Sequence, residues 1–257
     1  MAEPIERETP SPQENQDASS THDPRRAAVL ERLDRVNDPE LDESVVAMGF
    51  IGDLVVDGGD VRVDFRLPTY WCSANFAFLM AEDMRIAIET LPWVTRATVT
   101  LDDHFAARRI NRGIAEKLPF EEVFADETAE GLHRVRVVFR EKAFLGRQAA
   151  LLDALLRRDS AARTLAVSMA DLERLVHDDD EEIATAAARY LAARRHDGGR
   201  AEPDDPAFTT LEGTPVGEAM LADHRRATRR VLHAARANAE MCRIYLEERY
   251  SDAPRSQ

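Results

Sequence analysis

Cysteine is scarce in this sequence: its 257 residues include only Cys72 and Cys242. Two cysteines cannot form a disulfide framework, and a reducing cytosol would keep both as thiols. Neither belongs to a Cys-x-x-Cys pair, which excludes a zinc ribbon and a thioredoxin-type motif. Each cysteine is therefore either a packing residue or a chemically active thiol.

Long apolar runs and excess basic charge are also lacking. No run of about 18 apolar residues predicts a membrane span, and the first residues do not form the basic-then-apolar pattern of a signal peptide. We therefore expect a cytoplasmic protein. Acidic residues outnumber basic ones by 48 to 34, which gives a net charge of −14. That charge repels phosphate backbones and anionic lipid, so neither nucleic acid nor a membrane is an expected partner.

The N-terminal part predicts a tail followed by a helix. Residues 1–22 are rich in Pro, Glu, Gln and Ser, with few apolar side chains, so we expect them to be disordered. Asp23 and Pro24 form a helix start, because Asp is a good N-cap and Pro suits the first helical position. The helix should stop near Asn37, since Asp38 precedes a proline.

The next segments predict a small α/β domain over residues 23–105. Stretches 49–56 and 61–67 flank Asp-Gly-Gly-Asp and predict a hairpin. A helix follows over 73–90, and a third strand runs through 97–101. Because a helix joins the second and third strands, we expect them to be parallel, in a two-layer α/β (α+β) arrangement.

Residues 106–257 predict a mainly helical extension. Within it, 132–139 alternates apolar and polar residues and could be an added strand. Residues 196–206 have the Gly, Pro and Asp content of a linker, and a long final helix over about 216–249 contains Cys242. The segment Arg-Arg-Ala-Thr-Arg-Arg (225–230) indicates either an ion-pairing face or a partner contact.

Cys72 lies where a strand ends and a helix begins. A thiol at a helix N-terminus faces the positive end of the helix dipole, which favours the thiolate that binds soft metals or attacks electrophiles. Thr69 could hydrogen-bond the sulfur. The neighbours Tyr70, Trp71 and Phe76 leave a plain packing role equally open.

Three short motifs occur in order around this cysteine: Asp38-Pro39-Glu40, Gly49-Phe50-Ile51 and Thr69-x-x-Cys72. Together they resemble the iron–sulfur cluster assembly domain of SufT-like and PaaD-like maturation factors. The resemblance covers the α/β part only. It differs at Ser73, where the family usually has a proline.

The resemblance implies a cluster assembly or metalloprotein maturation factor, without classical enzyme turnover, that handles a labile iron–sulfur cluster or iron. Cys72 would be the cluster ligand or reactive thiolate. Asp38 and Glu40 would shape the pocket or supply an oxygen ligand, and Thr69 would orient the loop. The partners implied are a client metalloprotein or the assembly machinery, with the helical extension docking the client.

Other ligands and other functions remain open at this stage. One cysteine cannot hold a cluster that takes about four thiolates, so a homodimer, a further ligand such as Cys242 or His104, or a transient role would be needed. The plain alternatives are a helix-packing cysteine at Cys242 and a strand-end histidine beside solvated aspartates at His104. A metal-free protein-binding adaptor is the main alternative function, and a thiol enzyme with His104 as base for Cys72 is a third.

Overall fold

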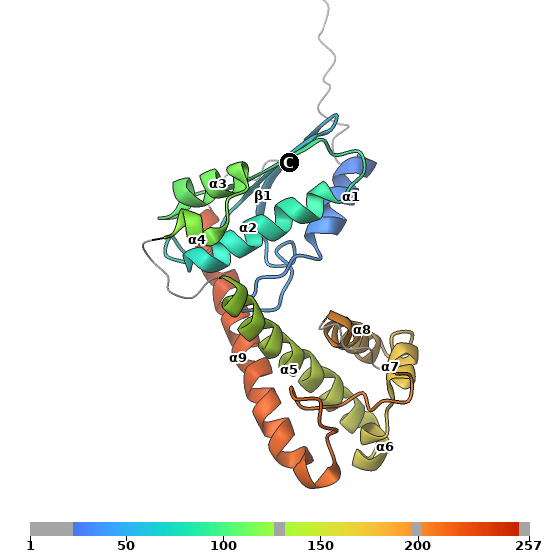
Figure 1. The fold of residues 1–257 in the computed structure, drawn as a ribbon. Helices are drawn as coiled ribbons and strands as arrows, with labels where there is room; N and C mark the ends of the chain where they lie inside the picture. The colour runs from blue at the N-terminus through green and yellow to red at the C-terminus, as the bar shows by residue number, and fades with distance from the viewer. Residues whose placement is uncertain (1–22, 126–131, 197–201, 252–257) are drawn as a thin grey trace, which may run out of the picture.

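The computed structural model describes residues 23–125, 132–196 and 202–251. The tail predicted to be disordered (1–22) and part of the predicted linker (197–201) lie outside these ranges. Figure 1 shows a small sheet with helices in the N-terminal part and a second part built of helices. The predicted fold class, an α/β domain with a mainly helical extension, is confirmed.

Helix α1 (Pro24–Leu33) begins as the sequence predicts. The carboxylate of Asp23 accepts a hydrogen bond from the Arg25 amide at 2.9 Å, and Pro24 takes the first helical position. The helix ends at Leu33, earlier than the predicted stop near Asn37. The chain there has already turned away, because Asn37 pairs with Ser44 in an isolated bridge that closes a loop.

The sheet has the order β1-β2-β3. Strands β1 (Ile51–Asp57) and β2 (Asp60–Phe65) form the predicted antiparallel hairpin, and β3 (Arg96–Leu101) runs parallel to β2. Helix α2 (Ala74–Glu89) makes the crossover and packs on the face that holds Val61, Val63 and Phe65, which are fully buried. The predicted parallel pairing of the second and third strands is confirmed.

The hydrophobic core of this domain extends beyond β3. Helix α3 (Ala107–Glu116) and the short helix α4 (Phe120–Val123) contribute to the same cluster as the sheet and α2. The last turns of α9 (Glu218–Tyr250) join it through Ala239 and Leu246. A side chain at Gly49, which has a φ of 73°, would meet Leu246 at 3.4 Å, so the start of the hairpin and the end of α9 are in contact.

The added strand expected at 132–139 is wrong. This segment is the first part of α5 (Leu132–Arg158), a helix of 27 residues. Leu132, Val135 and Phe139 are spaced three and four apart and pack on the first domain, with Phe139 edge-on to Phe76 at 4.9 Å. The period-2 pattern that suggested a strand comes from Val137, which the helix leaves 37% exposed.

The helical part has its own core, between α5 and three shorter helices: α6 (Ala161–Leu165), α7 (Met169–Leu175) and α8 (Glu181–His196). Leu151, Leu152 and Tyr190 are fully buried there. The described part of the segment between α8 and α9 also joins this core, because Pro206 pairs with Ser168 and Phe208 is buried.

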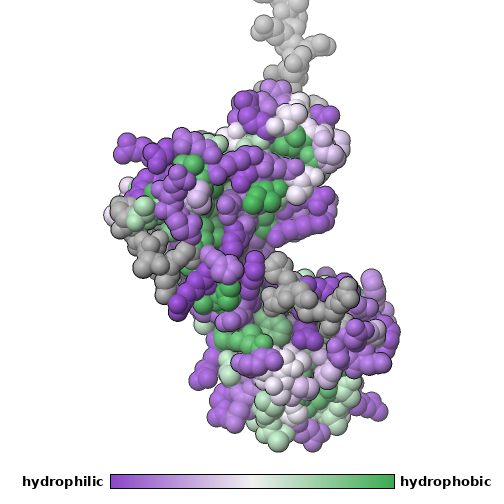
Figure 2. All heavy atoms as spheres, viewed as in Figure 1, coloured by the Kyte–Doolittle hydropathy of each residue, from purple (hydrophilic) through white to green (hydrophobic). Residues whose placement is uncertain are grey.

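Helices α5 and α9 connect the two parts. Helix α5 leads away from the first domain and α9 returns to it alongside, as Figure 1 shows. Hydrophilic residues dominate both parts on the face drawn in Figure 2. Within the described ranges, no helix is both long enough and apolar enough to cross a membrane.

Candidate functional site

Cys72 lies in the loop between β2 and α2. Its side chain is partly buried, and its sulfur is 3.3 Å from the hydroxyl of Thr69, the contact expected from the sequence. Ser73 takes the N-cap position of α2, although its hydroxyl donates to Asn75 Oδ1 and does not cap the helix. Ser73 therefore caps none of the amides in the first turn of α2, where the Phe76 amide donates to Asn75 Oδ1 at 2.8 Å.

Asp38 begins the Asp-Pro-Glu loop (residues 38–43). Its side chain is buried, and Oδ1 accepts hydrogen bonds from the amides of Glu40 and Leu41 at 2.8 and 2.9 Å. Burial raises the pKa of Asp38 to about 6, although the two amide hydrogen bonds act in the opposite direction. A buried carboxyl group that titrates near neutral pH is typical of functional sites.

Cys242 lies on α9, far from Cys72 in the sequence. Its side chain is partly buried and, like that of Cys72, packs against the hydrophobic core of the first domain. The pKa of its thiol is raised to about 11, mainly by burial and to a smaller extent by the charges of Asp38, Cys72 and Glu40. Docking of α9 on the first domain therefore places both cysteines at one hydrophobic core.

His104 supports the Cys72 loop from the other side. Its Nδ1 accepts a hydrogen bond from the Ala106 amide at 3.2 Å, which leaves the proton on Nε2. Nε2 donates that proton to the main-chain carbonyl of Cys72 at 2.7 Å. Burial lowers the pKa of His104, which keeps the ring neutral. In this arrangement both ring nitrogens are engaged with the main chain, so the ring tethers Cys72 and does not contact its sulfur.

Sequence comparison with known proteins identifies the family of the first domain. The sequence model of a family described as "Iron-sulfur cluster assembly protein" matches residues 26–100. An uncharacterized protein of Methanocaldococcus jannaschii is 33% identical over 90 residues, which are 35% of this chain and 93% of that protein. The chain belongs to the iron–sulfur cluster assembly protein family.

The candidate residues lie partly inside and partly outside the region that the family model matches. Asp38, Glu40, Thr69 and Cys72 lie within the residues that the iron–sulfur cluster assembly model matches, whereas Cys242 lies far beyond them. Of these five candidate residues, the helical extension therefore supplies Cys242.

The described residues of this domain do not form a resident cluster site by themselves. Thiolates are the normal ligands of iron–sulfur clusters, which take about four, and this chain has two cysteines. Among the described residues, no three His, Cys, Asp or Glu side chains are grouped so as to hold a metal ion. A cluster held here would need ligands from another molecule.

An ionic clamp holds the Asp-Pro-Glu loop to the helical extension, and the sequence analysis missed it. Asp42 has a φ of 54°, and both of its carboxylate oxygens bind Arg147 of α5, at 2.6 and 2.8 Å. Arg189 of α8 binds the Asp42 carbonyl and, at 3.1 Å, its Oδ2. The only local signal is that Asp tolerates a positive φ; its partners are more than 100 residues away in sequence.

Three exposed aromatic side chains border the Cys72 loop. Trp71 is 75% exposed and stacks on Phe105, with ring centroids 5.8 Å apart, while Tyr70 meets Trp71 edge-on at 4.9 Å. The Phe105 amide donates to the Tyr70 carbonyl at 3.2 Å, which ties the loop after β3 to the loop before α2. The surface beside Cys72 is therefore aromatic and accessible.

Proposed function

We propose that this protein binds iron or an iron–sulfur cluster transiently through Cys72, passes it to a client metalloprotein, and docks that client through its helical extension. Membership of the iron–sulfur cluster assembly family supports the general role in cluster assembly or maturation. The observation that carries the finer proposal is that Cys72 and Cys242, from distant parts of the chain, both pack against the core of the first domain.

The proposed roles of Cys72, Cys242, Asp38 and Thr69 follow from their surroundings. Cys72 is partly accessible and is the thiol that first meets iron. Cys242 is partly buried and its raised pKa keeps it protonated at neutral pH, so it would become a ligand only when a metal displaces its proton. Asp38 could accept that proton or offer an oxygen ligand, and the Thr69 hydroxyl orients the Cys72 sulfur.

The resulting site is incomplete in one chain. Two cysteines leave an iron–sulfur cluster short of ligands, so the remaining ones would come from the client, from the assembly machinery or from a second copy of the chain. A cluster held in this way would be labile, which suits a factor that must release it.

The test is anaerobic reconstitution with iron and sulfide, followed by absorption spectra and iron counts. We expect the wild-type protein to gain iron and Cys72→Ser to lose it. Thr69→Val preserves the shape of the residue and removes its hydroxyl, so it should retain iron but release it faster to an apo-ferredoxin acceptor.

Cys242→Ser separates two versions of the proposal. Loss of iron in this variant would show that the extension contributes a ligand, whereas unchanged iron binding would make Cys242 a structural residue. Equal iron in the wild type and in Cys72→Ser would refute the proposed role of Cys72. A wild-type protein that takes up no iron would favour the metal-free adaptor.

A further inference from the structure

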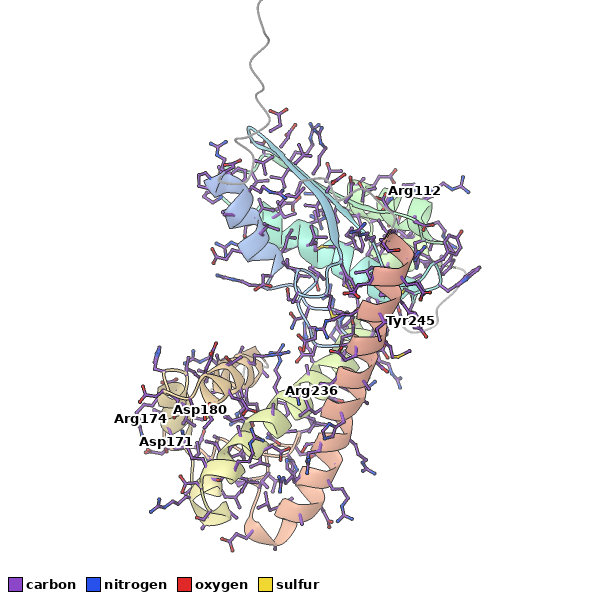
Figure 3. All side chains as sticks on the ribbon, turned by 180° about the vertical axis from the view of Figure 1, so that it is seen from behind. Arg112, Asp171, Arg174, Asp180, Arg236 and Tyr245 are labelled. Atoms are coloured by element: carbon purple, nitrogen blue, oxygen red, sulfur yellow. The ribbon has the colours of Figure 1, made fainter. Side chains whose placement is uncertain are left out.

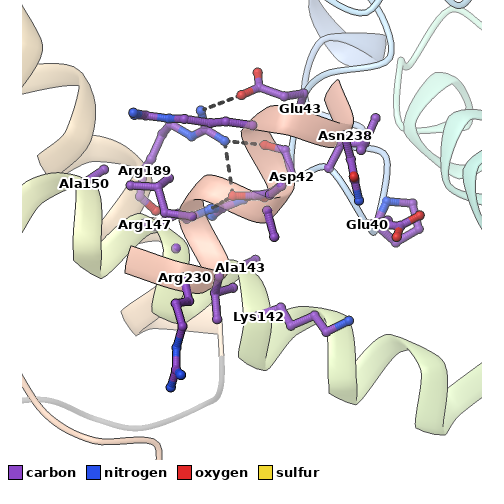
Figure 4. A pocket seen from close by; sticks show the side chains of 18 of the residues that line it. Glu40, Asp42, Glu43, Lys142, Ala143, Arg147, Ala150, Arg189, Arg230 and Asn238 are labelled. Atoms are coloured by element: carbon purple, nitrogen blue, oxygen red, sulfur yellow. Dashed lines mark hydrogen bonds and ion pairs between the residues drawn. The ribbon is translucent and has the colours of Figure 1, made fainter. Parts of the chain in front are cut away.

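A cavity of about 360 Å³ opens between the Asp-Pro-Glu loop, α5 and α9 (Figure 4). Its walls are small and apolar side chains, contributed by facing stretches of the two long helices. They include Ala143, Gly146 and Ala150 of α5, and Val231, Ala234 and Ala235 of α9. The volume lies in the range of ordinary ligand-binding pockets.

The rim of this cavity is positively charged. Lys142, Arg230 and Arg236 line it, and none of the three has a carboxylate within ion-pairing distance in the part of the chain that the structure describes. The acidic residues of the rim are fewer: Asp42 and Glu43 already pair with Arg189, which leaves Glu40. The rim thus has an excess of positive charge in a protein whose net charge is −14.

The basic segment noted in the sequence accounts for part of this rim. Arg225 and Arg229 both pair with Asp153, and Arg226 pairs with Asp223. Arg230 is the member of the segment that lines the cavity. Three arginines of the segment therefore form ion pairs, as one interpretation of the sequence proposed. The fourth, Arg230, is available for the other interpretation, a partner contact.

We propose that this cavity binds an acidic, apolar segment of a partner protein. Apolar walls favour apolar side chains, and the three cations favour carboxylates by charge complementarity. Arg230 and Arg236 are six residues apart on α9, about 9 Å along the helix axis. A polypeptide with several spaced carboxylates matches that separation, whereas a small molecule with one carboxylate group does not.

The position of the cavity gives such binding a consequence at the candidate site. Pro39 and Glu40 form part of its lining, so a bound segment touches the loop that begins with the buried Asp38. This inference rests on the proposed function in one respect, namely that the extension docks a client. Its test uses no iron, so the two proposals can fail separately.

The probe is a fluorescein-labelled peptide of 15 residues made of Glu, Leu and Ala in an amphipathic helical pattern. Fluorescence anisotropy at low salt measures its binding to the full-length protein. Two comparison peptides replace all Glu by Lys or all Leu by Ser. We expect saturable binding of the acidic, apolar peptide and at least tenfold weaker binding of the other two.

Two variants locate the binding. The triple variant Lys142→Glu, Arg230→Glu, Arg236→Glu removes the positive rim, and Ala235→Trp fills the apolar space without changing charge. Each should weaken binding at least tenfold, with circular dichroism showing that the protein remains folded. The matched control reverses three exposed arginines of the first domain: Arg62, Arg108 and Arg112. Figure 3 shows Arg112 on that domain, away from Arg236 on α9.

Several outcomes would overturn the inference. These are equal binding by the triple variant and its control, equal binding of all three peptides, and no binding of any peptide. Light scattering over a range of protein concentrations covers a further case. Self-association that the peptide displaces and the triple variant abolishes would identify a second copy of the chain as the occupant, in place of a different partner.

Discussion

The guanidinium group of Arg147 on α5 holds both carboxylate oxygens of Asp42 in the Asp-Pro-Glu loop, at 2.6 and 2.8 Å. Both side chains are more than four-fifths buried. A paired arrangement of this kind fixes the direction of both groups as well as their distance. The loop that presents Asp38 and Glu40 is therefore positioned by the helical extension.

Replacing Arg147 by Ala should destabilise the protein by about 1–3 kcal/mol, because a buried carboxylate would lose two charge-assisted hydrogen bonds. Arg189 retains its contacts with Asp42 and limits the effect. Urea denaturation measures the change. Arg35→Ala is the control: its pair with Glu31 is exposed, so we expect a change within about 0.5 kcal/mol. Equal effects of the two substitutions would contradict a structural role for the clamp.

Gly113 on α3 should not tolerate a larger residue. A side chain there would lie 2.5 Å from Val123 Cγ2 and 3.0 Å from Phe78, so Gly113→Ala should cost about 1–3 kcal/mol of stability. Gly146→Ala on α5 is the same exchange inside another helix, but its new methyl group would meet only Leu232 Cα, at 3.9 Å. That variant should gain about 0.5–1 kcal/mol from helix propensity. A neutral Gly113→Ala would show that α3 and α4 do not pack tightly on α2.

Local patterns were sufficient to predict the hairpin, the parallel third strand and the position of Cys72. Each depends on residues close in sequence: the turn at 57–60, the crossover helix and a strand-to-helix junction. The segment 132–139 was assigned wrongly because Val135, Val137 and Phe139 fit a strand, while Leu132, Val135 and Phe139 fit a helix equally well. The contact of the helix with Phe76 and the first domain decides between them.

The rest of the site depends on how distant segments dock. The packing of Cys242 against the core of the first domain requires α9 to return to that domain, and Ala239 and Leu246 bury themselves there to make it do so. In the same way, Asp42 meets Arg147 and Arg189 across more than 100 residues of sequence. Contacts between segments so far apart follow no local sequence pattern, so they cannot be predicted from a single sequence.

The two thiols should differ in reactivity. At pH 8, a pKa of about 11 in place of 9.0 leaves Cys242 with about one hundredth of the thiolate of an ordinary thiol. Because a thiolate of higher pKa is intrinsically more nucleophilic, about tenfold of this loss in reaction rate is recovered. In Cys72→Ser, we expect Ellman's reagent to modify Cys242 at least tenfold more slowly in the folded protein than in urea. In Cys242→Ser, the partly exposed Cys72 should react faster than Cys242 does. Equal rates for both thiols in the folded protein would argue against the raised pKa of Cys242.

Asp38 should make stability fall as the pH rises. Its pKa is about 6 in the folded protein against an ordinary value of 3.8, so between these pH values the folded state keeps a proton that the unfolded state has lost. The stabilisation is full below pH 3.8 and is lost as the pH rises through 6. The shift in pKa corresponds to about 3 kcal/mol of unfolding free energy, which is lost by neutral pH.

Asp38→Asn tests this expectation, because its amide oxygen can still accept the hydrogen bonds from Glu40 and Leu41. Urea denaturation from pH 4 to pH 8 should show the variant more stable than the wild type at pH 8, by about 1–3 kcal/mol. The difference should shrink as the pH falls toward 4, where Asp38 is protonated in the folded state and partly protonated in the unfolded state. A difference that does not change with pH would mean that the carboxyl group titrates normally and is not held in a buried, proton-binding state.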